Sequence, residues 1–179
     1  MLFRSEKALS CYEESLAISR KICDRRTLAL SYLGLGAMFC SLGKYPKAND
    51  HNKKGLDILT EIGDKEGKSK FCLNQGDVEY AVGNVIKAKE YFLEGLAISK
   101  EIGNGEVEEA SYLRLGRLLL SKAAYVRKNE LEKAREHLEK SILIQKEIAD
   151  RSGEAISHAK LGAACQSVGE YEKDRKSVV

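Results

Sequence analysis

A pattern of apolar residues recurs in four copies along the chain. Each copy has two apolar residues two positions apart, then an isoleucine four positions later that ends the apolar run. The pairs are Leu16 with Ile18, Leu56 with Ile58, Leu96 with Ile98 and Ile142 with Ile144, and the isoleucines are Ile22, Ile62, Ile102 and Ile148. We interpret these positions as the buried face of a helix. Successive copies are 40, 40 and 46 residues apart, so the sequence predicts an internal repeat.

Two series of small residues keep the same register. They are Ala8, Ala48, Ala88 and Ala134, with Asp174 where the next alanine is due, and Gly36, Gly76, Gly116 and Gly162. Six residues are therefore inserted between Gly116 and Ala134, near Lys122–Lys128. Helical spacing continues through Leu115, Leu119 and Ala123, which predicts that the helix before the insertion is extended.

Two breaks interrupt each copy and divide it into two helices, so we expect an all-α chain. One break follows the isoleucine: Gly supplies the left-handed residue that ends one helix, and Asp or Asn caps the next helix. These breaks are Cys23-Asp24, Gly63-Asp64, Gly103-Asn104 and Ala149-Asp150. The other break lies at Gly43, Gly83, Asn129 and Gly169, residues that tolerate a positive φ. Asn129 with Glu132 resembles a capping pair that starts the helix after the insertion.

The register predicts a single helical-repeat domain over residues 1–179. If each unit is helix A followed by helix B, the chain has one lone helix B, three whole units and one truncated unit. The predicted ranges are 1–23, 24–63, 64–103, 104–149 with the insertion, and 150–179. We therefore expect a fragment of a longer array, with homo-oligomerisation through open ends as the alternative.

The unit resembles the tetratricopeptide repeat. In helix A the resemblance rests on Tyr32-Leu35-Gly36 and Tyr112-Leu115-Gly116, and in helix B on Ala8-Tyr12 and Ala88-Phe92, whereas Asn52 departs from the pattern. The family's standard unit is about 34 residues, and the longer period is similar to the subclass of Pins-type G-protein-signalling modulators, rapsyn and large repeat scaffolds. The resemblance implies a right-handed superhelical solenoid of antiparallel helix pairs that acts as a non-enzymatic protein-binding scaffold or adaptor.

The resemblance also implies a concave groove lined by helix A, where a partner's peptide or helix would bind. The groove candidates are Lys70, Leu73, Asn74, Asp77, Tyr80, Leu113, Arg114, Arg117 and Lys160. Arg can hold a carboxylate through two hydrogen bonds and Asn can pair with a peptide backbone, so we expect a partner segment with acidic residues. The alternatives are that these are ordinary solvated side chains, and that the chain is a structural spacer or a self-associating segment.

Composition excludes several other functions. Thirty basic and 27 acidic residues leave a net charge of +3 with no long like-charge run, so we expect no nucleic-acid partner. No apolar stretch is long enough for a membrane span, and the N-terminus lacks a signal peptide. The five cysteines include no C-x-x-C pair, which indicates neither a disulfide framework nor a zinc site and favours a cytoplasmic location. They are Cys11, Cys23, Cys40, Cys72 and Cys165.

The sequence also predicts no catalytic residues, no metal and no cofactor. The three histidines, His51, His137 and His158, lie on different predicted helices, and no metalloprotease, hydrolase or phosphate-loop motif is present. His51 and His137 occupy the same position of helix B, so the repeat accounts for them.

Overall fold

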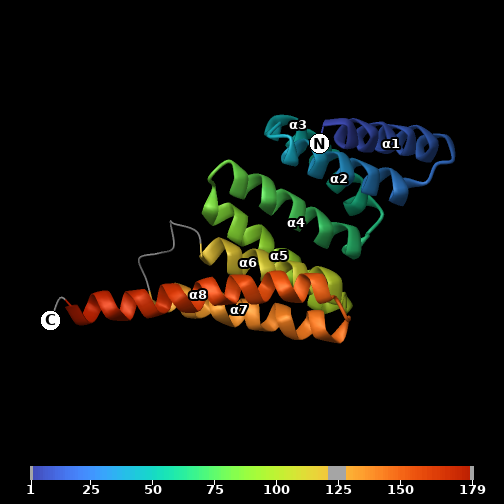
Figure 1. Cartoon of the computed structure of the whole chain (residues 1–179). Helices are drawn as coiled ribbons and strands as arrows, with labels where there is room; N and C mark the ends of the chain where they lie inside the picture. Colours follow the sequence, from blue (N-terminus) through green and yellow to red (C-terminus); the bar gives the residue numbers. More distant parts are fainter. Residues whose placement is uncertain (1, 121–127, 178–179) are drawn as a thin grey trace. The chain divides into compact units, whose positions relative to one another are not determined.

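The chain is entirely helical over the residues that its computed structural model describes, 2–120 and 128–177 (Figure 1). Its helices are α1 (Leu2–Lys21), α2 (Arg25–Ser41), α3 (Tyr45–Glu61), α4 (Lys65–Ala81), α5 (Val85–Ile102), α6 (Gly105–Leu119), α7 (Lys128–Glu147) and α8 (Arg151–Ser177). No strand occurs in these two ranges. The prediction of an all-α chain built from helix pairs is confirmed.

The helices fall into two compact units, and each is described by itself below. Unit 1 comprises Met1–Gly103 and contains α1 to α5, whereas unit 2 comprises Asn104–Val179 and contains α6 to α8. The expectation of one continuous array over residues 1–179 stays a prediction.

The predicted capping residues begin their helices as expected. The Asp24 side chain accepts a hydrogen bond from the backbone N–H of Thr27 at 3.0 Å, which satisfies one of the amides that has no partner inside α2. The side chains of the other three capping residues accept the same hydrogen bond from the backbone N–H three residues later. They are Asp64 at 2.9 Å, Asn104 at 3.1 Å and Asp150 at 3.0 Å. The four helices that follow these residues, α2, α4, α6 and α8, are therefore capped as the sequence predicts.

Six turns in the described part of the chain contain a residue with the left-handed backbone conformation, and four of these six residues are glycine. The glycines predicted at these turns have positive φ: Gly43 70°, Gly63 69°, Gly83 90° and Gly103 67°. Cys23 and Ala149 adopt the same conformation, with φ of 57° and 58°. A residue with a Cβ is strained in this region, and a local backbone hydrogen bond closes each of these two turns. Asp24 N–H donates to the Ser19 carbonyl at 3.0 Å, and Asp150 N–H donates to the Gln145 carbonyl at 2.9 Å.

Three predictions about the second half of the chain are wrong. Asn129 does not form a turn, because α7 begins one residue earlier, at Lys128. Gly169 does not end a helix either, because α8 continues through it to Ser177. Strong helix formers such as Glu170 and Lys173 follow it, and one glycine inside a helix costs only about 1 kcal/mol. Finally, α6 is not extended, since it ends at Leu119. Residues 121–127 of the insertion lie outside the described residues.

Helix A and helix B of each pair meet at the repeated glycine. A Cβ added to Gly76 would lie 2.4 Å from Cε1 of Phe92, and one added to Gly116 would lie 2.7 Å from Cγ of Leu138. Both partner side chains are fully buried. Ala48, Ala88 and Ala134 are also fully buried, so small residues allow the close approach that the sequence predicted.

Candidate functional site

The α4 candidates form a polar stripe along one side of helix A in unit 1. Lys70, Asn74, Asp77 and Tyr80 are each half-buried and lie three or four residues apart, which keeps them on one face of the helix. Leu73 differs, because only 7% of its surface is exposed. The role of Leu73 in a groove stays a prediction.

Asn74 already binds a peptide backbone, that of the neighbouring helix. Its side-chain amide donates a hydrogen bond to the carbonyl oxygen of Leu33 in α2, at 3.0 Å. This bond joins two successive helices A and fixes the orientation of the Asn74 amide. Asn74 therefore contributes to helix packing, which its sequence position did not reveal.

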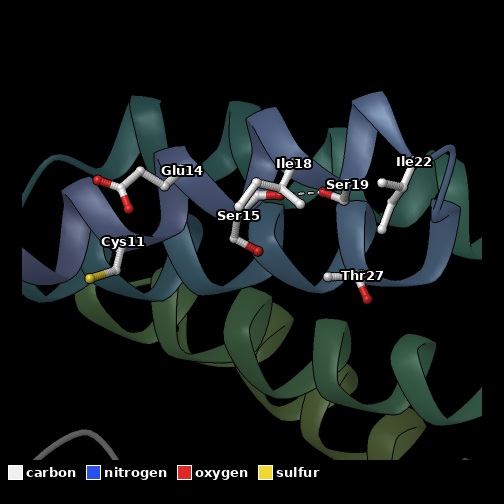
Figure 2. Close-up of a pocket in the computed structure, with 7 residues that line it drawn as sticks. All are labelled: Cys11, Glu14, Ser15, Ile18, Ser19, Ile22 and Thr27. Carbon is white, nitrogen blue, oxygen red and sulfur yellow. Dashed lines mark hydrogen bonds between the residues drawn. The ribbon is translucent and has the colours of Figure 1, made fainter.

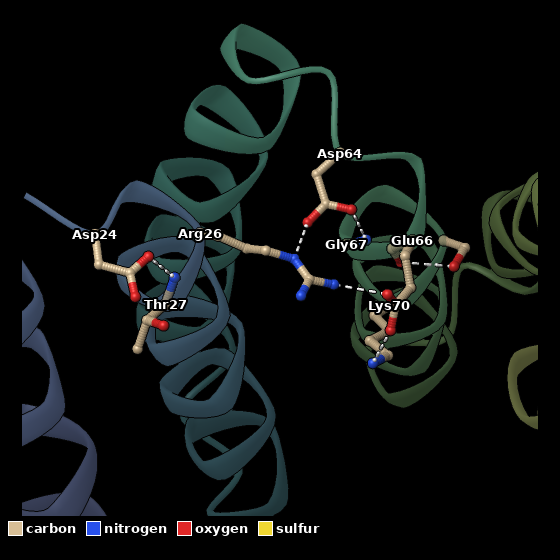
Figure 3. Close-up of polar contacts among 8 residues, drawn as sticks. Asp24, Arg26, Thr27, Asp64, Glu66, Gly67 and Lys70 are labelled. Atoms are coloured by element: carbon tan, nitrogen blue, oxygen red, sulfur yellow. Dashed lines mark hydrogen bonds and ion pairs between the residues drawn. The ribbon is translucent and has the colours of Figure 1, made fainter.

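Four charged residues link the N-terminal parts of α2 and α4 (Figure 3). The Arg26 guanidinium donates from Nε to Asp64 at 2.8 Å and from a terminal nitrogen to Glu66 at 2.6 Å. The Lys70 ammonium contacts the other Glu66 oxygen at 2.8 Å. Glu66 is therefore held between two cations, one on each helix A.

These ion pairs shift the pKa values of their members. The hydrogen bond from Lys70, with the charge of Arg26 adding to it, lowers the pKa of the Glu66 carboxyl. The hydrogen bond to Asp64 raises the pKa of Arg26. Both groups are thus held in their charged forms around neutral pH. Side-chain exposures of 53% for Arg26 and 38% for Glu66 leave this cluster accessible to water and to a ligand.

Sequence reasoning missed Arg26 and Glu66 as members of this surface. Their signal is present in the register, because the two residues lie 40 positions apart and carry opposite charges. In a stacked repeat protein, equivalent positions of neighbouring repeats lie side by side. Opposite charges 40 residues apart thus predict an ion pair between neighbouring repeats.

The unit 2 candidates lie on two helices. Leu113 and Arg114 are half-buried and Arg117 is exposed on α6, while Lys160 is half-buried on α8. A terminal nitrogen of Arg114 lies 3.3 Å from the carbonyl oxygen of Ala110, one turn earlier. Unit 2 thus presents cationic side chains on both of its helices A.

The two helix B histidines pack against aromatic residues of helix A. His51 stacks on Phe39 with ring centroids 5.1 Å apart and lies 5.9 Å from Tyr32. His137 lies 5.6 Å from Tyr112 in the equivalent place. Burial lowers the pKa of His51. Both histidines therefore belong to the packing between the two helices of a repeat unit.

The cysteines and acidic residues show no reactive or metal-binding cluster within the described part of the chain. Cys72 is buried, and burial raises its pKa to about 12, which keeps it as an unreactive thiol. The described residues contain no group of three or more His, Cys, Asp or Glu side chains that could hold a metal ion. None of the described helices combines the length and apolar character needed to cross a membrane.

Comparison with known families finds the tetratricopeptide repeat family, which matches residues 2–61. That range covers α1, α2 and α3. No curated protein matches the chain significantly. The family match therefore rests on the first helices of unit 1.

Solved structures extend the likeness to the rest of the chain. A crystal structure of BtubC from P. vanneervenii has a TM-score of 0.74 at 19% identity and covers 97% of this chain and 70% of its own. A Podosopora anserina protein with nearly identical TPR-like repeats has a TM-score of 0.65 at 19% identity, with coverages of 96% and 82%. A STAND protein with a tetratricopeptide repeat sensor from Pyrococcus horikoshii has a TM-score of 0.68 at 23% identity, and the match covers 83% of this chain but only 22% of that protein. At these identities the likeness concerns the fold alone.

Proposed function

We propose, on the premise that the chain has a tetratricopeptide-type fold, that it is a non-enzymatic scaffold binding an acidic segment of a partner protein. Proteins of this repeat fold generally serve as protein–protein interaction scaffolds. The 40-residue period favours the Pins-like and rapsyn-like subclass, and the reduced cysteines favour the cytoplasm.

The observation that carries the proposal is the polar and cationic character of the helix A faces. The binding residues proposed are Lys70, Leu73, Asn74, Asp77 and Tyr80 in unit 1 and, as a separate set, Leu113, Arg114, Arg117 and Lys160 in unit 2. Charged hydrogen bonds from Lys and Arg to a carboxylate are about twice as strong as neutral ones. Tyr80 in unit 1 and Leu113 in unit 2 each supply apolar surface on the helix that carries the charges of that unit, which suits an extended peptide or helix with acidic and apolar residues.

The cluster at Glu66 indicates how an acidic ligand would bind to unit 1. Glu66 occupies the position of a carboxylate between Arg26 and Lys70, so a ligand carboxylate would take its place and the same cations would hold it. The ligand competes with Glu66. Removing the Glu66 charge should therefore increase the affinity for acidic peptides.

The test compares peptide binding by matched charge variants of the full chain. Arg114→Glu with Arg117→Glu should reduce capture of an acidic peptide array by about tenfold or more, because two favourable charges become repulsive. Lys53→Glu with Lys87→Glu on helices B makes the same change in net charge at exposed sites. This control should bind as the native chain does.

Two outcomes decide between binding and the spacer alternative. Glu66→Gln should bind acidic peptides more tightly than the native chain while circular dichroism shows unchanged helicity. If native, double-Arg and Glu66 variants bind equally, the helix A faces are not a ligand site, and a spacer role is favoured.

A further inference from the structure

The two helices A of unit 1, α2 and α4, contact each other and form one surface. Glu66 of α4 forms an ion pair with α2 near their N-terminal ends, and in the middle Asn74 donates to the Leu33 carbonyl oxygen. Toward the C-terminal ends, burial raises the pKa of the Cys40 thiol, and the charge of Asp77 raises it further. Cys40 of α2 therefore lies near Asp77 of α4, and the two helices are adjacent along their length.

The α2 side of this surface is apolar, whereas the α4 side is polar. Leu30 and Ala37 of α2 occupy the positions that Lys70 and Asp77 occupy in α4, forty residues later. Leu30 and Cys40 are half-buried and Ala37 is exposed. These three residues are three or seven positions apart, so they share one face of the helix. We call Leu30, Ala37 and Cys40 the α2 strip.

Neighbouring helices A leave these positions open. α4 has a helix A before it, which is α2, and its residues at the same positions show what such a neighbour covers. Lys70 and Asp77 of α4 are still half-buried, with part of their surface exposed. A helix A packed beside α2 in the same way would therefore leave Leu30 and Ala37 accessible to a ligand.

An extended peptide matches a surface that has two different sides, because its successive side chains point in opposite directions. One set of side chains would lie on the α2 strip and the other on α4. Leu30 and Cys40 are ten residues apart, which corresponds to about 15 Å along a helix. Five extended residues span about 14 Å from the first to the fifth. Three apolar side chains at alternate positions therefore cover the α2 strip.

The charges on the surface decide where an acidic side chain of the ligand lies. Arg26 and Lys70 hold Glu66 through contacts of 2.6 and 2.8 Å near the N-terminal ends of the two helices. Asp77 lies seven residues beyond Lys70, which is about two helical turns. A ligand carboxylate is attracted by Arg26 and Lys70 and repelled by Asp77. The acidic residue therefore belongs at one end of the bound segment.

We propose that unit 1 binds an extended segment of a partner protein in which three apolar residues alternate with polar ones and the polar residue at one end is acidic. The apolar side chains lie on the α2 strip, and the acidic side chain lies between Arg26 and Lys70. This segment is a specific form of the acidic ligand proposed above and rests on that proposed function. Leu30 and Ala37 are its specificity-determining residues.

The probes are two fluorescent peptides of equal composition between the same glycine–serine flanks. One has the alternating order Leu-Glu-Leu-Ser-Leu, and the other has the blocked order Leu-Leu-Leu-Glu-Ser. Binding to the full chain is measured by fluorescence anisotropy. The alternating peptide should bind about tenfold more tightly, because only its order places all three leucines on the α2 strip with the glutamate at the two cations. Equal affinity of the two peptides overturns the proposal.

Matched variants of the full chain assign the preference to the α2 strip. Leu30→Lys with Ala37→Asp installs on α2 the residues of α4 and leaves the net charge unchanged. This variant should bind the alternating and blocked peptides equally. The control, Leu93→Lys with Ala97→Asp, makes the same two replacements at exposed positions of α5, where α3 has these residues. The control should keep the tenfold preference.

A single variant keeps the test decisive if the double variant on α2 is less stable. Leu30 also packs against the core cluster that contains Leu33 and Phe71, so its replacement can disturb folding. Ala37 is exposed, and Ala37→Asp alone should leave the circular dichroism spectrum unchanged. It should still reduce the preference for the alternating peptide, because a charge replaces an apolar contact. An unchanged preference in a folded Ala37→Asp chain contradicts the proposal.

A second exposed apolar surface, on α1, lies outside the proposed site. Ile18 and Ile22 are 58% and 65% exposed beside a hollow of about 250 Å³, which Cys11 and Thr27 also line (Figure 2). The equivalent residue of α3, Ile58, packs against α2, so a helix B uses this face to pack on its own helix A. Ile18→Glu should therefore leave binding of both peptides unchanged.

A third peptide, in which glutamine replaces the glutamate of the alternating peptide, separates this proposal from the proposed function. If the glutamate strengthens binding while residue order and the α2 variants have no effect, the extended segment is overturned and the acidic ligand stands. If none of the peptides binds, both are overturned. Loss of binding in the α5 control or in Ile18→Glu would place the ligand on a helix B and overturn the extended segment alone.

Discussion

The α2–α3 and α4–α5 pairs share one backbone arrangement but fill it with different chemistry. At the helix B position that faces the helix A glycine, α5 has Phe92 and α3 has Asn52, both fully buried. One position earlier, α5 has Tyr91, whose ring meets the Phe71 ring edge to face with the ring centroids 6.1 Å apart. At that position α3 has His51. One pair is thus apolar at this site and the other is polar and titratable.

The polar pair gains a directional contact that the apolar pair lacks. The Asn52 amide donates to Gln75 of α4 at 3.2 Å, and Gln75 donates in turn to Asn49 at 2.8 Å. The Oδ1 atom of Asn52 has no hydrogen-bond partner, which is a cost in a buried site. The comparison teaches that the glycine fixes where the helices meet, whereas its partner decides whether burial or hydrogen bonding holds the contact.

Truncating the apolar contact should have the largest effect. Phe92→Ala removes a fully buried ring from Gly76 and leaves a cavity, so we expect a loss of about 3–5 kcal/mol of unfolding free energy. Urea denaturation followed by circular dichroism measures it. A loss below 1 kcal/mol would mean that α4 and α5 close over the site and that the glycine contact is not specific.

Converting the polar pair into the apolar type should have an intermediate and non-additive effect. Asn52→Leu or Gln75→Leu alone should each lose about 1–2 kcal/mol, because each leaves a buried amide without its partner. The double variant should be close to the native stability, since Leu138 and Leu35 occupy the equivalent positions in other units. A double-mutant cycle measures the coupling, and strictly additive losses would contradict the network.

The smallest effect should be a pH dependence confined to the polar pair. Burial lowers the pKa of folded His51 below its usual value near 6.5. The unfolded chain therefore binds more protons as pH falls below that value, and stability is lost until the pH passes the folded pKa. His51→Tyr, which installs the residue of α5, should reduce the loss of urea midpoint between pH 7.5 and 5. If His51→Tyr leaves the pH profile of the urea midpoint unchanged, His51 does not contribute to the pH dependence of stability.

Local chemistry made the turns and the helix starts predictable from the sequence. Asp24, Asp64, Asn104 and Asp150 cap helices because a short side-chain oxygen reaches an amide three residues on, which needs no other part of the fold. Asn129 and Gly169 were misjudged for the opposite reason. A residue that tolerates a turn does not enforce one when helix formers flank it.

The candidate site was less predictable, because its contacts join different units. The register placed Lys70 and Asn74 on helix A, but it did not reveal that Asn74 binds the Leu33 carbonyl or that Glu66 lies between Lys70 and Arg26. The register also placed Leu73 and Leu113 at the same position of helix A, but it did not reveal that Leu73 is buried whereas Leu113 is half-buried.

The sequence by itself determined the period, the helix pairs, the capping residues and the small residues where helices approach closely. These features depend on backbone chemistry and on residues that repeat at a fixed interval. Only the tertiary structure decided that Asn52 binds Gln75, and that Ile18 stays exposed while Ile58 is covered. Each of these depends on which helix packs against the residue, since burial and hydrogen bonding arise between elements that are distant in the sequence.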